Sequence, residues 1–150
     1  MRIFVTVGTT PFDRLICTID QINESQHEII IQTANPKIKI TNHKHFQWVD
    51  HINNYFNWAD LIICHAGAGT IYNLLEMKKL IIVVPNFDRI DQHQKEIASY
   101  IEDKNYGLVC YDTNNLYNLI DSIKGKKFAP YNKESFFVRQ NIIDFINSKM

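Results

Sequence analysis

The sequence carries no excess of either charge, because 16 basic and 16 acidic side chains give a formal net charge of zero. Proteins that bind nucleic acids present a basic patch or stripe to the phosphates, and this balance gives no sign of one. The chain also lacks an apolar run long enough to cross a membrane, and no signal-peptide pattern precedes its first strand-like segment. We therefore expect a cytoplasmic protein that reaches a membrane only through another chain.

Cysteine is scarce, and the three residues Cys17, Cys64 and Cys110 lie far apart in apolar surroundings. Their odd number argues against a disulfide framework, and their spacing does not resemble a zinc site. We expect buried free thiols in a reducing compartment.

Three familiar nucleotide-binding motifs are absent. Without G-x-x-x-x-G-K-[ST] there is no P-loop. Gly8-Thr9-Thr10 after the first strand is not G-x-G-x-x-G, and no acidic residue ends the second strand, which disfavours a nicotinamide cofactor. Asp-x-Asp, the usual carboxylate pair for a metal–nucleotide complex, does not occur. A diphosphate would then be neutralised by helix N-termini and by neutral or cationic donors.

Strand and helix patterns alternate along the 150 residues, which we interpret as one domain, residues 1–150. Apolar, β-branched runs predict strands at 3–7, 28–34, 46–49, 61–65, 80–84 and 108–111. Apolar spacing predicts helices at 11–22, 52–58, 68–77, 91–103, 115–123 and 132–148. The polar segment 35–44 is interpreted as a loop that could include a short edge strand at 38–40. This order predicts an α/β fold, a Rossmann-like doubly wound parallel sheet.

The segment from Leu61 to Thr70 combines a buried strand, a turn with Gly67 and Gly69, and the start of a helix. Glycine allows a tight bend and a close approach to the backbone. The first N–H groups of a helix have no partner inside it, so such a segment can bind an anion. The alternative is a tight connection that binds nothing. His65, which ends the strand, could be a nucleotide contact or a histidine satisfied in the core.

Ligands of parallel sheets bind at the carboxyl ends of the strands. We therefore expect the loops 8–11, 65–70 and 86–94 to lie together. The sequence Asp91-Gln92-His93-Gln94 places four hydrogen-bonding side chains at one helix start. The alternative is an Asp cap followed by surface residues.

The last predicted helix carries a wide apolar surface. It is formed by Phe136, Phe137, Ile142, Ile143, Phe145 and Ile146. Such a surface usually packs into a core, and in a chain this short part of it could face a partner.

Four segments together resemble a known family. They are Phe4-Val-Thr-Val-Gly-Thr-Thr-Pro-Phe-Asp13, Trp58-Ala-Asp-Leu-Ile-Ile-Cys-His-Ala-Gly-Ala-Gly-Thr70, Ile81-Ile-Val-Val-Pro-Asn86 and Asp91-Gln-His-Gln94. Their order and spacing resemble glycosyltransferase family 28. The resemblance is to its stand-alone C-terminal halves: the PssE-like subunits of bacterial capsule and exopolysaccharide synthesis and the catalytic subunit of the dolichol-linked GlcNAc transferase. It covers most of residues 1–111.

The resemblance implies the C-terminal, donor-binding half of a GT-B fold and a role for each motif. The donor diphosphate would be held by Gly8, Thr9, Thr10, Gly67, Ala68, Gly69 and Thr70. The donor sugar and its phosphates would face Asp91, His93 and Gln94. The family usually has a Glu for the ribose hydroxyls eight residues after the strand-ending histidine, and here that residue is Asn73. An Asn can still bond a diol, but without charge assistance.

The function implied is a UDP-sugar-binding catalytic subunit of a two-chain inverting glycosyltransferase that extends a lipid-linked saccharide. A membrane-anchored PssD-like subunit would bind the acceptor at the inner face of the cell membrane. The resemblance implies no cofactor and no metal, because the helix N–H groups would stabilise the departing UDP. Two alternatives stay open: a non-catalytic enhancer that stabilises its partner, and a free-standing nucleotide sensor.

Overall fold

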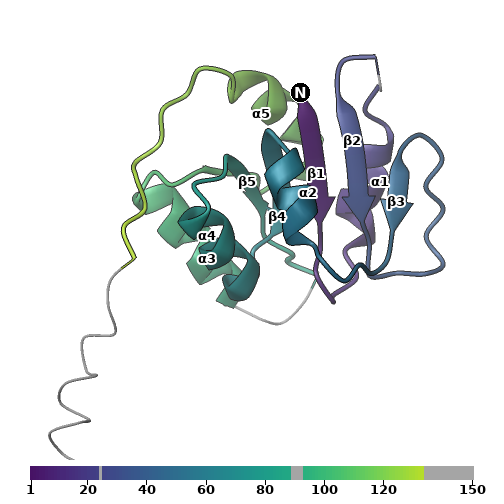
Figure 1. Ribbon diagram of the computed structural model, residues 1–150, viewed down its shortest axis with the longest axis horizontal. Coiled ribbons are helices and arrows are strands. Elements are labelled where there is room, and N and C mark those ends of the chain that lie inside the picture. The colour runs from purple at the N-terminus through teal and green to yellow at the C-terminus, as the bar shows by residue number, and fades with distance from the viewer. Residues whose placement is uncertain (24, 89–92, 134–150) are drawn as a thin grey trace, which may run out of the picture.

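The computed structural model describes residues 1–23, 25–88 and 93–133. In this part of the chain six parallel strands form one sheet with the order β3-β2-β1-β4-β5-β6 (Figure 1). The strands are β1 (Arg2–Thr6), β2 (Glu28–Gln32), β3 (Lys44–Phe46), β4 (Leu61–His65), β5 (Ile81–Val84) and β6 (Leu108–Val109). The helices are α1 (Asp13–Asp20), α2 (Asn53–Trp58), α3 (Ala68–Glu76), α4 (His93–Asp103) and α5 (Leu116–Ser122), with a 3₁₀ turn η1 (Thr113–Asn115). The strand order reverses between β1 and β4, so the predicted doubly wound fold is confirmed.

Helices cover both faces of the sheet (Figure 1). On one face α1 and α5 bury Leu15, Ile16 and Ile120 against the strands. On the other face α2, α3 and α4 form a second core cluster, to which Leu74 and Ile101 contribute. Neighbouring residues of β1 and β4 alternate between the two clusters. These strands are therefore buried on both sides, which is why they are continuous apolar runs in the sequence.

The edge strand β3 corrects one prediction. The strand lies at Lys44–Phe46, beside Ile30–Gln32 of β2, and not at 46–49. Lys44 and His45 are exposed, so no apolar run marks this strand. The segment 38–40 is not a strand either. Ile40 is buried against the face that α1 covers, from a loop whose next residues bond to Asp20 at the end of α1.

After α5 the chain crosses to the other face of the sheet. Ala129 N donates to Asn105 O at 2.8 Å, and the Tyr131 ring contacts two tyrosine rings from α3 and the segment after α4. Lys133 Nζ then pairs with Glu76 Oε1 at 2.8 Å. The predicted helix 132–148 lies almost wholly outside the described residues, as does its apolar surface, and residues 132 and 133 are not helical. No helix in the described ranges is long and apolar enough to cross a membrane.

Candidate functional site

The loops after β1 and β5 meet at the carboxyl edge of the sheet, as expected from the parallel topology. Asn86 Nδ2 donates to Pro11 O at 3.4 Å, and Arg14 pairs with Asp88 at 3.3 Å. The loop after β4 joins them, because the His65 ring contacts both Gly8 and Gly67. The loop 8–11, the loop 65–70 and the described part of the segment 86–94 therefore lie together at this edge, as predicted.

The N-terminus of α3 is open. Its cap residue Gly67 has no side chain to cap the helix, and Ile71 N is the first helical donor bonded back to Gly67 O, at 3.0 Å. The N–H groups of Ala68, Gly69 and Thr70 have no acceptor among the described residues. Ala68 and Gly69 are exposed, and a Cβ added to Gly69 would meet no atom within 4 Å. Together with the helix dipole, these unpaired donors form a site suited to an anion.

The imidazole of His65 lies between the two glycine loops. A Cβ on Gly67 would overlap His65 Nε2, and a Cβ on Gly8 would stand 3.0 Å from His65 Cε1. Gly8 also has a φ of 60°, which favours glycine, whereas the φ of Gly67 is −90° and would suit any residue. The sequence predicted that glycine at 67 allows a close approach to the backbone. The structure shows that the approaching group is a side chain of the protein itself.

Burial lowers the pKa of the His65 imidazole, against a weaker opposing contribution from the Thr6 backbone. At neutral pH the ring is therefore uncharged. An anion bound to the N-terminus of α3 would favour its protonated form, because an opposite charge nearby raises the pKa of a histidine. His65 is thus a group through which pH can act on anion binding.

The loop after β1 uses most of its backbone donors within the protein. Gly8 N donates to Gln32 Oε1 at 3.0 Å and contacts Thr6 Oγ1 at 3.3 Å, while Thr10 N donates to Val7 O at 3.3 Å. Thr9 is exposed, and neither its N–H nor its hydroxyl has a partner among the described residues. The predicted roles of Gly8, Thr9 and Thr10 stay predictions, with Thr9 the residue best placed to donate to a ligand.

The motif at the start of α4 divides into residues with different surroundings. Gln94 is buried, with 7% of its surface exposed, and its Oε1 accepts from Asn86 N at 2.9 Å. Its side chain therefore holds the loop after β5. His93 is exposed and lies 3.4 Å from Glu96 Oε2. Asp91 lies outside the described residues.

Asn73, predicted to face the ribose, is half-buried on α3, one turn beyond Thr70 and on the same side of the helix. Its Nδ2 donates to Asn53 Oδ1 of α2 at 3.2 Å. Its Oδ1 accepts from no donor among the described residues and could accept from a ligand hydroxyl. The nearest carboxylate along α3, Glu76, is paired with Lys133.

A cavity of about 330 Å³ adjoins the glycine loop. It is lined by Gly8, Thr9, Gln32, Ala34, Gln47, Trp48, Val49 and Ile52. Trp48 is 76% exposed at its rim. Sequence reasoning missed both Gln32 and Trp48. Trp48 lies inside the segment 46–49 that was predicted as a strand, and no sequence signal marked either residue as part of a cavity.

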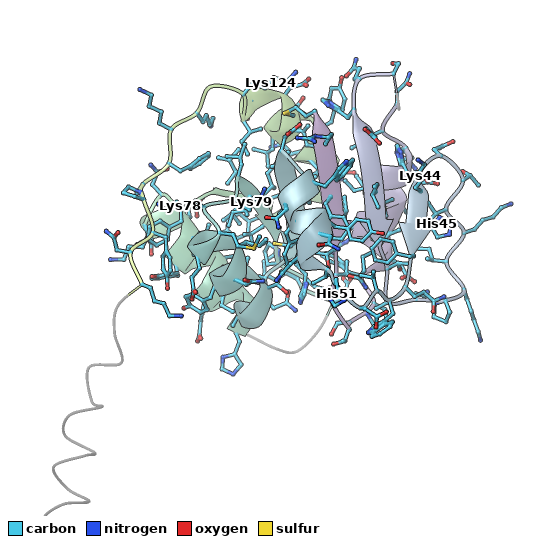
Figure 2. All side chains as sticks on the ribbon, viewed as in Figure 1. Lys44, His45, His51, Lys78, Lys79 and Lys124 are labelled. Atoms are coloured by element: carbon cyan, nitrogen blue, oxygen red, sulfur yellow. The ribbon has the colours of Figure 1, made fainter. Side chains whose placement is uncertain are left out.

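Among the described residues Arg14 is a cation at the carboxyl edge, where it pairs with Asp88, and the lysines that follow α3 and α5 lie away from it. His51 lies at the carboxyl edge, whereas Lys124 lies at the opposite end of the molecule (Figure 2). Lys78 and Lys79 follow the other end of α3, roughly 15 Å from its first residue. Among the described residues no group of three or more His, Cys, Asp or Glu side chains could hold a metal ion.

The cysteines have no part in the site. Cys64 and Cys110 are buried free thiols, and burial raises their pKa to about 12 and about 11. They are therefore inert thiols. Cys17 is free but exposed on α1, which corrects the prediction that it is buried.

A family model matches nearly the whole chain, and the match includes all four motifs that resemble a glycosyltransferase family. The model of the glycosyltransferase family 28 C-terminal domain matches residues 2–136. The chain belongs to this family. The family assignment suggested by the motifs is therefore confirmed, and the chain is a glycosyltransferase domain.

Individual relatives support the same assignment. The UDP-N-acetylglucosamine transferase subunit ALG13 of Yarrowia lipolytica is 31% identical over 133 residues, which are 77% of this chain and 68% of that protein. The ALG13 subunit of Mus musculus is 33% identical over 73% of this chain, but the match spans 10% of that longer protein. This chain thus corresponds to one part of some relatives.

Solved structures of other glycosyltransferases share the fold. The NMR structure of ALG13 superimposes with a TM-score of 0.62 at 21% identity, over 94% of each chain. Acinetobacter baumannii MurG gives a TM-score of 0.62 at 19% identity, over 83% of this chain and 41% of that chain. The glycosyltransferase family 28 chain is thus a Rossmann-like domain with the fold of a C-terminal GT-B half.

Proposed function

We propose that this chain is the UDP-sugar-binding catalytic subunit of a two-chain inverting glycosyltransferase. Its acceptor would be a lipid-linked saccharide in capsule or exopolysaccharide synthesis, bound by a membrane-anchored PssD-like subunit. The nucleotide sugar is supported by the relatives named as UDP-N-acetylglucosamine transferases. The two-chain arrangement is supported by their description as subunits and by the match to 41% of MurG.

The observation that carries the proposal is the open N-terminus of α3. Three consecutive N–H groups, from Ala68 to Thr70, have no acceptor among the described residues, and a Cβ built on Gly69 would meet none of their atoms within 4 Å. A charged ligand at such a helix end gains about 0.3–1 kcal/mol, and up to roughly 2 kcal/mol when partly buried. The cavity beside Trp48 lies next to this end, across the Gly8 loop, and offers an apolar wall to a nucleoside.

In the proposed reaction the acceptor hydroxyl displaces UDP from the anomeric carbon of the sugar. Charge then develops on the departing diphosphate, where the N–H groups of α3 and the Thr9 hydroxyl would donate to it. We assign His93, which is exposed, and Asp91 to the donor sugar because the family resemblance implies these roles. We assign the base that deprotonates the acceptor to the partner chain.

The test is a transfer assay with radiolabelled UDP-sugars and membranes that contain this chain, its partner, both or neither. The proposal predicts product only when both chains are present. Transfer by the partner alone would exclude a catalytic role for this chain. A membrane sample with the Gly69→Ala variant tests whether the end of α3 is required.

A non-catalytic enhancer is the second candidate, and one set of contacts favours it. Asn73 and Gln94, two of the residues assigned to the donor, are bonded within the protein to Asn53 and Asn86. An enhancer predicts no UDP binding by calorimetry, alone or with the partner, and unchanged transfer after His93→Ala. Transfer that depends on His93 together with measurable UDP binding would exclude it.

A further inference from the structure

Gln32, the last residue of β2, is a buried polar side chain with every hydrogen-bonding position in use. Only 5% of its surface is exposed. Its Oε1 accepts from Thr6 Oγ1 at 2.6 Å and from Gly8 N at 3.0 Å. Its Nε2 donates to Gly8 O at 2.9 Å and to Gln47 O at 3.0 Å. An amide offers two acceptor positions and two donors, so this one is fully satisfied.

The orientation of this amide follows from its partners. Gly8 N can only donate, so it requires the oxygen of Gln32, and the carbonyls of Gly8 and Gln47 require its nitrogen. The carbonyls of two separate loops thus converge on one NH₂ group. Without that group the two carbonyls would lose the donor that they share, at a partly buried place. The two loops would then have to separate or admit water.

The two loops are opposite walls of the cavity next to the open helix end. Gly8 and Thr9 form one wall, Gln47 and Trp48 form part of the other, and Gln32 lies between them. The Gly8 loop also contacts the His65 ring, which abuts Gly67 at the cap of α3. One side chain therefore sets the width of the cavity and fixes the loop that joins the cavity to the anion site.

We propose that Gln32 is a positioning residue. It holds the loop after β1, which contains Gly8, and the loop after β3, which contains Trp48, at the separation needed for one nucleotide to contact both. It acts through the two loops and takes no part in the chemistry. The inference rests on the proposed function, because a nucleotide is the ligand that would span a cavity and an anion site. It adds a residue that none of the four family-like motifs contains.

The test uses the full chain with Trp58→Phe as background. The chain has two tryptophans, so this change leaves Trp48 as the source of tryptophan emission. Gln32→Met keeps the length of the side chain and removes its donors and acceptors. Gln32→Glu keeps the acceptors and loses the NH₂ group. Ile120→Val, buried in α5 on the far face of the sheet, is the control for a general loss of stability. Hydrogen exchange at Gly8 N and Trp48 emission are measured without ligand, and UDP affinity is measured by calorimetry.

In Gln32→Met we expect faster hydrogen exchange at Gly8 N and altered Trp48 emission. UDP affinity should fall by about ten-fold or more, because a buried hydrogen-bond network is lost. Ile120→Val should keep the UDP affinity of the parent. In Gln32→Glu the affinity, relative to the parent at each pH, should recover as the pH falls, because a protonated carboxyl can donate to one of the two carbonyls. If Gln32 contributed to stability alone, the UDP affinity of Gln32→Glu would not recover at low pH. The UDP affinity of Gln32→Met would then also be the same as that of Ile120→Val.

Equal UDP affinity in Gln32→Met and the parent would overturn the positioning role and leave the proposed function intact. Unchanged Gly8 exchange and Trp48 emission would overturn it as well. Absence of UDP binding by the parent chain, both alone and with its partner, would contradict the proposed function itself. The two ligand-free measurements then still decide whether Gln32 links the loops.

Discussion

Gly69 is the position at which stability and ligand binding should respond in opposite directions. It lies in the first turn of α3, and a Cβ built on it meets no atom within 4 Å. Alanine is favoured over glycine in a helix by about 0.5–1 kcal/mol, because glycine loses more backbone freedom on folding. We expect Gly69→Ala to raise the free energy of unfolding by about this amount, and the thermal midpoint by roughly 1–4 °C for a chain of this size.

The same methyl group should weaken the binding of a diphosphate. It would occupy the space from which an anion approaches the N–H groups of Ala68, Gly69 and Thr70. A hydrogen bond to a charged group contributes about 1.5–3 kcal/mol, so the loss of one such bond lowers the affinity roughly ten- to a hundred-fold. UDP calorimetry measures the affinity, and denaturant unfolding of the same samples measures the stability.

Gly67→Ala is the matched comparison, two residues earlier. Its Cβ would overlap His65 Nε2, so we expect a loss of about 1–3 kcal/mol of stability from overpacking. His65→Ala should remove much of that loss in the double variant, as a mutant cycle would show. Unchanged UDP affinity in Gly69→Ala would refute the anion site. Lower stability in that variant would refute the conclusion that a methyl group on Gly69 meets no other atoms.

Three further predictions concern single side chains. Burial lowers the pKa of both His65 and His27, so the unfolded chain binds more protons below about pH 6.5, and the free energy of unfolding should fall as the pH drops through that range. A UDP-sugar, whose phosphates do not titrate there, should bind more tightly over the same range, and calorimetry should show no such trend in His65→Gln. Gln94→Ala should cost about 1–3 kcal/mol of stability because Asn86 N loses its buried acceptor, whereas His93→Ala at an exposed position should change it by less than about 0.5 kcal/mol in denaturant unfolding. Asn73→Glu should tighten UDP binding several-fold by calorimetry if the residue faces the ribose, since a carboxylate accepts hydrogen bonds more strongly, and unchanged affinity would place the ribose elsewhere.

The fold was predictable because five of the six strands are apolar runs, and four of these contain buried residues. Ile29 and Ile31 of β2 and Ile62 and Ile63 of β4 illustrate this, since a parallel sheet with helices on both faces requires apolar residues on both sides. The edge strand β3 could not be placed this way. Its exposed Lys44 and its neighbours carry no pattern, and the strand is defined by pairing with β2 alone.

The site was predictable in position but not in detail. Parallel topology and the glycines after β1 and β4 are local features of the sequence, and they located the three loops. The contacts that hold the loops join residues far apart in the chain. Gln32 and Gly8 are separated by 24 residues, and Asn86 and Pro11 by 75. No periodicity or short motif encodes such pairs, so they become visible only once the chain is folded.

Several polar side chains at the carboxyl edge bind the protein's own backbone. Gln32 holds Gly8 and Gln47, Gln94 holds Asn86, and Asn86 reaches Pro11. A loss of transfer after alanine substitution at any of them would therefore follow from a displaced loop as readily as from a lost catalytic group. Among the described residues the donors left for a ligand include the N–H groups of Ala68, Gly69 and Thr70, which no side-chain truncation can remove. Such a site can be blocked only by adding atoms, so a methyl group on Gly69 tests it more directly than the removal of any side chain around it.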